Sequence, residues 1–101
     1  MLTRAQTEIL ELMLDTGEEM VADGIQVWVG DRRTSHSTLL ALLRVLAVQD
    51  VSDVKGISRY VVDRRFAQAL LTNPELCDQI ANALRANTPF TLNDNNRLEL
   101  I

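Results

Sequence analysis

The only stretch of the chain that combines side chains suited to nucleophilic chemistry is Ser35-His36-Ser37. A hydroxyl nucleophile needs a base within hydrogen-bonding reach, and His36 is the only histidine of the protein. Neighbours in sequence at the start of a helix do not thereby face one another, and a helix is predicted to begin here. We therefore interpret His36 as a surface or capping residue, and we expect no catalytic residues and no enzymatic activity.

Residues that bind metals are sparse. The chain has one histidine and one cysteine, Cys77, with no second ligand at the spacing of a zinc site. Cys77 falls in a predicted helix near its apolar stripe, which indicates a buried structural thiol. The four glycines form no phosphate-binding loop. We expect neither a metal nor another cofactor.

Length and composition are those of one globular domain. The protein has 101 residues, of which 47% are hydrophobic and 24% charged. No apolar run approaches the roughly 18 residues that suggest a membrane span, and the start of the chain lacks a signal-peptide pattern. A single cysteine allows no internal disulfide. We expect a cytoplasmic protein without membrane contact.

The charges are distributed unevenly along the chain. The net charge is −4, yet residues 32–65 contain seven of the ten bases and only three acids. Residues 1–31 contain seven acids and one base. A basic segment of this kind indicates a polyanionic partner, although ordinary solvated surface explains it equally well.

The first helix signal stands at the start of the chain. Thr3 and Gln6 have the spacing of a capping box, and apolar residues then recur on one helical face. Gly17 fits the left-handed C-cap of a helix. We predict a helix over residues 4–16.

The next segment predicts one strand. Residues 25–29, IQVWV, alternate and are rich in β-branched side chains. Residues 32–34 are predicted to form a loop, and residues 18–24 fit either a short helix or a loop. Trp28 alternates with its valine neighbours, so it faces the opposite side of the strand, either as a core residue or as an exposed anchor for a partner.

A helix and a tight hairpin follow. Thr34 or Ser35 can cap a helix that is predicted to run to about Val48. Two strands are predicted over residues 51–54 and 57–62, because Lys55-Gly56 between them suits a tight turn.

The C-terminal third predicts two more helices and a hairpin. Asp63 caps a helix that ends near Leu71, and Asn73-Pro74-Glu75 is a typical start for a helix that ends near residue 86. Residues 90–101 are predicted to form a terminal β-hairpin.

From Leu2 to Val62 this order of elements resembles the winged helix-turn-helix superfamily. LTRAQTEILELML resembles the first helix of such domains, STLLALLRVL the recognition helix, and VSDVKGISRYVV the wing. The resemblance implies an α+β fold with a winged-helix-like core over residues 1–63. Residues 64–101 would form a C-terminal extension of helices and a terminal β-hairpin within the same single domain.

The resemblance also implies a DNA-binding transcription regulator, and we expect this protein to be a homodimer through the region after Asp63. The recognition helix would enter the major groove of double-stranded DNA, and the wing would lie beside the phosphate backbone. The DNA-binding residues implied in this way are Arg32, Arg33, Ser35, His36, Ser37, Arg44, Lys55 and Arg59.

A second function stays open because of the predicted helix over residues 35–48. Apart from Arg44, its middle is apolar on all sides, whereas a helix that reads bases offers hydrogen-bonding side chains. The alternative is therefore a protein-protein interaction module or inhibitor on a winged-helix-like frame, without DNA binding.

Overall fold

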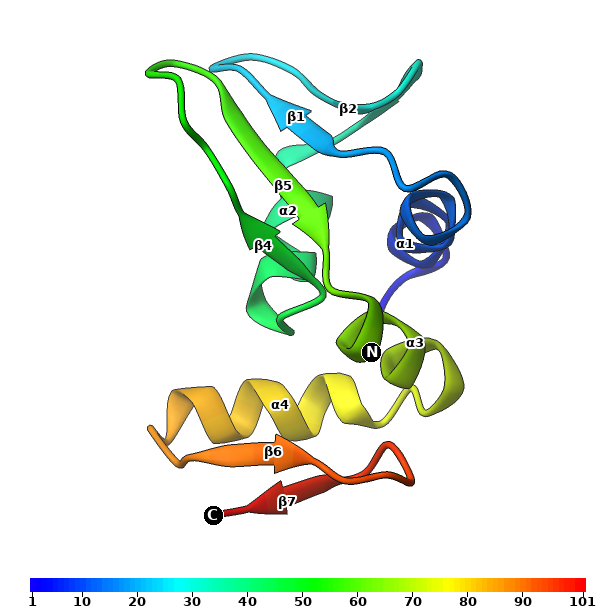
Figure 1. Cartoon of the computed structure of the whole chain (residues 1–101), viewed down its shortest axis with the longest axis vertical. Coiled ribbons are helices and arrows are strands. Elements are labelled where there is room, and N and C mark those ends of the chain that lie inside the picture. The colour runs from blue at the N-terminus through cyan, green and yellow to red at the C-terminus, as the bar shows by residue number, and fades with distance from the viewer.

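The computed structural model describes all 101 residues and contains four helices and seven strands (Figure 1). In chain order they are α1 (Arg4–Thr16), β1 (Met20–Ala22), β2 (Val27–Val29), β3 (Arg32–Thr34), α2 (His36–Arg44), β4 (Val48–Asp50), β5 (Ser58–Val62), α3 (Arg64–Thr72), α4 (Leu76–Arg85), β6 (Phe90–Leu92) and β7 (Leu98–Leu100). The predicted α+β class is confirmed.

Five strands form one antiparallel sheet in the order β3-β2-β1-β5-β4, and β6 and β7 form a separate hairpin. Helix α2 lies behind β4 and β5 in Figure 1, and α4 lies with the hairpin at the end of the molecule far from β1 and β2. We call the sheet face that packs against the helices the inner face, and the opposite one the outer face.

The core fills the inner face. The register places Met20 of β1 beside Val29 of β2 and Tyr60 of β5, and all three are buried. From the helix side, Met13 of α1 and Leu42 of α2 have no exposed surface. One cluster of 20 buried residues joins the sheet to all four helices and to Leu92 of β6.

The ends of α1 follow the sequence signals. The side chain of Thr3 accepts a hydrogen bond from the Gln6 amide, and the Gln6 side chain accepts one from the Thr3 amide. Gly17 adopts φ of 72° and donates its N–H to Met13 O at 2.9 Å. The predicted capping box and C-cap are confirmed.

The segment between α1 and α2 differs from the prediction. Part of the ambiguous stretch 18–24 is strand β1, and the predicted strand 25–29 begins only at Val27. The reason is a turn at Asp23, whose Oδ1 accepts from both Ile25 N and Gln26 N at 2.7 Å. These backbone hydrogen bonds lower the pKa of Asp23 below its usual value, and the bond from Gln26 N contributes most.

The loop predicted over residues 32–34 is wrong, because those residues form the edge strand β3. Gly30 adopts φ of 56° in the turn after β2, and the turn brings Arg32 opposite Val29 and Thr34 opposite Val27.

The helix predicted to reach Val48 ends at Arg44. Leu46 has a positive φ of 61°, which a continuing helix cannot accommodate. Val48 instead pairs with Val62 as the first residue of β4, so β4 precedes the predicted strand 51–54. Beyond β4, Val51 N donates to Arg59 O at 2.8 Å, and an isolated bridge joins Val54 to Ile57 across the turn at Gly56.

The C-terminal elements follow the prediction closely. Helix α3 begins after Asp63, helix α4 begins two residues later than predicted, and β6 and β7 form the expected hairpin. Arg65 of α3 donates Nη2–H to Leu92 O at 2.8 Å, and Phe66 packs edge-on against Phe90 with ring centroids 6.4 Å apart. These contacts fix the hairpin to α3. None of the helices combines the length and apolar character needed to cross a membrane.

Replacing Asp63 by Ala tests the junction between the sheet and α3. The Asp63 carboxylate accepts from Phe66 N at 3.1 Å and from Gln49 Nε2 at 2.8 Å. We expect Asp63→Ala to lower the free energy of unfolding by about 1 kcal/mol, the usual cost of a lost N-cap, in urea denaturation followed by circular dichroism. The exposed Asp94→Ala is the control and should change it little; equal effects of the two variants would contradict this role of Asp63.

Candidate functional site

The outer face of the sheet carries one row of side chains that runs across four strands. Arg33 of β3 is paired with Trp28 of β2, Trp28 with Val21 of β1, and Val21 with Arg59 of β5. Directly paired residues point to the same side of an antiparallel sheet. We call these four residues the outer-face row; at the usual strand spacing it spans about 14 Å.

The apolar members of this face are half-buried but lie outside the core. Val21, Trp28 and Val61 have intermediate exposure, and none of them belongs to the core cluster or packs against it. Figure 1 shows no helix in front of β4 and β5, on the side away from α2. Val21, Trp28 and Val61 are therefore partly exposed apolar side chains that lie apart from the core cluster.

Arg59 is held at one end of the row by two carboxylates. Its Nε and Nη2 lie 3.0 and 2.7 Å from the two carboxylate oxygens of Glu19, and its Nη1 lies 2.9 Å from Asp53 Oδ1. The hydrogen bonds to Glu19 and then to Asp53 raise the pKa of Arg59 above its usual value. Such a two-pronged pair fixes the guanidinium plane and neutralises its charge.

Arg33 at the other end of the row is different. Its side chain is exposed and makes no ion pair with any carboxylate of the chain. It is therefore the charge of the row that is available to a partner. Arg32 points to the inner side, where its Nη2 lies 3.1 Å from Glu8 Oε2 of α1.

The other residues implied as DNA contacts lie in separate places. Ser35 caps α2, since its Oγ accepts from Thr38 N at 3.2 Å, and His36 and Ser37 are exposed in the first turn. Arg44 is in the last turn of α2, where its charge stabilises the helix end. Lys55 lies in the turn at the tip of the β4–β5 hairpin, and β4 is the opposite edge of the sheet from β3.

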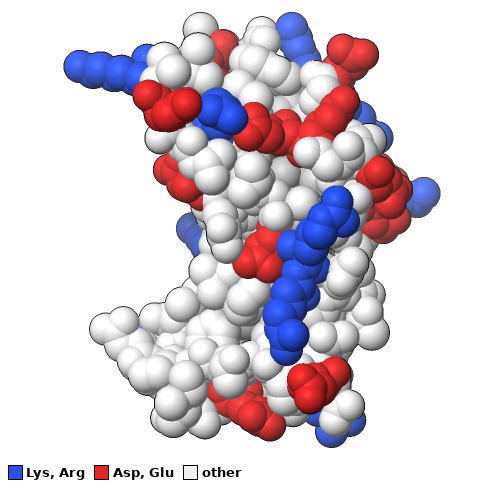
Figure 2. Space-filling model, viewed as in Figure 1, with Lys and Arg blue, Asp and Glu red and all other residues white.

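The basic segment of the sequence is thus not one basic surface in the fold. Strands β3 and β4 are the two edges of the sheet, and His36 and Arg44 are about 12 Å apart along α2. Figure 2 shows the Lys and Arg side chains interspersed with Asp and Glu. Arg33 and Arg59 share the outer face of the sheet, but they stand at opposite ends of the outer-face row.

The sequence pattern does not indicate three residues of this site. Val21 and Glu19 fall in the stretch 18–24, which fits a short helix or a loop by its sequence, and Asp53 falls in the predicted strand 51–54 but lies between β4 and β5. Met20, Val21 and Ala22 are all apolar, so no alternation of apolar and polar residues marks β1 in the sequence, and only their burial alternates. The strand is only three residues long, so the sequence pattern alone could not separate it from a loop.

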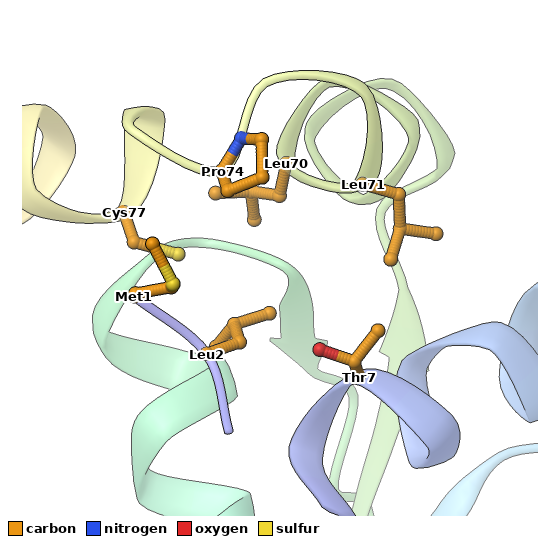
Figure 3. A pocket seen from close by; sticks show the side chains of 7 residues that line it. All are labelled: Met1, Leu2, Thr7, Leu70, Leu71, Pro74 and Cys77. Carbon is orange, nitrogen blue, oxygen red and sulfur yellow. The ribbon is translucent and has the colours of Figure 1, made fainter. Parts of the chain in front are cut away.

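A separate small cavity of about 210 Å³ lies where the N-terminus meets the turn between α3 and α4 (Figure 3). Its walls are mostly apolar, and Cys77 is buried in one of them. Burial raises the pKa of the Cys77 thiol, which disfavours the reactive thiolate. This fits the predicted structural role of Cys77. No group of three His, Cys, Asp or Glu side chains could hold a metal ion.

No protein family, no curated protein and no solved structure matches this chain.

Replacing Arg59 by Met, which keeps the aliphatic stem but removes the charge, tests whether its ion pairs stabilise the sheet. We expect a lower urea midpoint for Arg59→Met and for Glu19→Gln, a double variant less destabilised than the sum of the two, and a smaller effect at high salt. Arg4→Met is the matched control, because Arg4 pairs with Glu8 only on the surface, with 94% of its side chain exposed. Equal midpoints for Arg59→Met and Arg4→Met would show that the Arg59 pairs add nothing to stability.

Proposed function

We propose that this protein is a protein-interaction module that binds its partner on the outer face of the sheet, with Trp28 as the central anchor. The observation that carries the proposal is that Val21, Trp28 and Val61 are half-buried on this face without packing against the core. Surface tryptophans and arginines contribute much of the binding energy in protein interfaces, and the outer-face row has one Trp between two Arg.

The charges of the row indicate what kind of partner fits. Arg59 is already neutralised by Glu19 and Asp53, whereas Arg33 is exposed and unpaired. A partner segment that places an apolar side chain over Trp28 and a carboxylate next to Arg33 would satisfy both. Polyanions are a poorer match, because the face also carries the two carboxylates that hold Arg59 and the protein has a net charge of −4.

The contribution of Trp28 can be measured because it is the only tryptophan. Affinity capture with the wild-type protein should recover a partner whose purified form shifts the emission of Trp28 on binding. We expect Trp28→Ala to weaken this binding about 30-fold or more and Arg33→Glu to weaken it clearly, since a truncated anchor costs 2 kcal/mol or more.

Leu40→Ala is the matched control for that experiment. Leu40 is 51% exposed but lies on α2, on the helical side of the sheet, so its truncation should leave binding unchanged. Urea midpoints establish that each variant is folded. A partner that binds Trp28→Ala as tightly as wild type, or that leaves the emission of Trp28 unchanged, would contradict the proposal.

A second candidate function is DNA binding by a winged-helix-like regulator. The observation that favours it is that Arg33, His36 and Ser37 are exposed and nearly consecutive where β3 leads into α2, and that a hairpin with Gly56 in its turn follows α2. In this proposal α2 would read the major groove and the hairpin turn with Lys55 would contact phosphates.

Fluorescence anisotropy with labelled duplex DNA distinguishes the two functions. If the protein binds DNA, affinity should fall steeply between 50 and roughly 200 mM salt, and the triple replacement of Arg32, Arg33 and Arg44 by Ala should abolish it. Arg85→Ala, on α4, is the control and should have no effect. Absence of binding at low salt would exclude this function while leaving the protein-interaction proposal intact.

A further inference from the structure

Strand β7 has an unpaired edge. Beyond the strand ends, Asn93 N donates to Arg97 O at 2.9 Å and Ile101 N donates to Pro89 O at 3.1 Å. Backbone hydrogen bonding alternates along an antiparallel strand, so the N–H and C=O groups of residues 97, 99 and 101 point toward β6. The backbone N–H and C=O groups of Leu98 and Leu100 therefore point away from β6, and Figure 1 shows no element beyond β7.

The hairpin is also incomplete as a hydrophobic unit. A two-stranded sheet is only marginally stable by itself in water, and here α4 covers only part of the hairpin. Leu98 and Leu100 line one side of an open groove of about 450 Å³ whose other side is α4, and Leu100 remains 65% exposed. An additional strand beside β7 would pair the free backbone groups and cover Leu98.

We infer that a second copy of this chain occupies the edge of β7, antiparallel to it, so that two hairpins form one four-stranded sheet. The two-fold axis passes between Leu98 and the partner's Leu98, whose free N–H and C=O groups then bond to one another. In this register Arg97 lies directly opposite Glu99 of the partner subunit, and Glu99 lies opposite the partner's Arg97.

Complementary charges favour the register centred on Leu98 and a second copy of the chain as the partner. Arg97 and Glu99 are both exposed, and Arg97 makes no ion pair within its own chain. Two opposite-charge pairs across the strands favour self-association. The neighbouring register, centred on Glu99, would instead set two Glu99 carboxylates against each other, which is unfavourable. The interface lies at the end of the molecule far from β1 and β2, so it leaves the outer-face row free (Figure 1).

Charge reversal tests this arrangement by sedimentation equilibrium. The wild-type protein should be a dimer, and R97E and E99R should each raise the dissociation constant about tenfold or more, because each variant makes both cross-strand pairs like-charged. The double variant R97E/E99R restores opposite charges and should dimerise like wild type. Mixing R97E with E99R should give a heterodimer, since both of its pairs are again attractive.

Arg85→Glu is the control, because it makes the same arginine-to-glutamate reversal on α4 and not on β7. It should leave the dissociation constant unchanged. Circular dichroism and urea midpoints establish that each variant is folded. A monomeric wild-type protein at millimolar concentration, a dimer unaffected by R97E, or a failure of R97E and E99R to associate on mixing would overturn the inference. None of these outcomes bears on binding at Trp28, so failure here is distinct from failure of the proposed function.

Discussion

The double pairing of β1 is the constraint on which the rest of the structure depends. This strand has three residues, yet it joins the β2–β3 hairpin on one side to the β4–β5 hairpin on the other. Without β1 the two hairpins would be separate two-stranded sheets, and such sheets are only marginally stable in water. Its central position also forces a strict alternation: Met20 and Ala22 enter the core, while Val21 is placed on the outer face.

This alternation explains how one short strand serves both stability and the candidate site. On the inner face Met20 is fully buried between Val29 and Tyr60. On the outer face Val21 completes the row between Trp28 and Arg59, and Glu19, just before the strand, fixes the guanidinium of Arg59. The backbone beneath the binding surface that we propose is therefore anchored through Met20 and Ala22, which are buried in the core.

Local signals predicted the elements whose ends depend on their own residues. The capping box at Thr3, the cap at Asp63 and the terminal hairpin required no knowledge of the rest of the chain, and the structure contains all three. Strand pairing is different, since β1 and β3 are each only three residues long and owe their conformation to neighbours far along the chain. The end of α2 was also misjudged, because its apolar sequence continues past Arg44 while Val48 leaves to pair with Val62.

The same limitation applied to the site. Adjacent bases in the sequence suggested one basic surface, but neighbouring residues of a strand point to opposite faces, so Arg32 reaches Glu8 of α1 while Arg33 joins the outer-face row. Only the register of the sheet shows that Arg33 and Arg59 belong to one surface. Only the folded structure shows that Arg59 already forms ion pairs with the carboxylates of Glu19 and Asp53.

The most direct test of this account is the pairing of β1, measured by nuclear magnetic resonance in solution. We expect cross-strand nuclear Overhauser effects that connect Val21 with both Trp28 and Arg59, together with extended-strand chemical shifts over residues 20–22. Helical shifts over residues 18–24, or contacts from Val21 to only one of the two strands, would contradict the sheet order and with it the outer-face row.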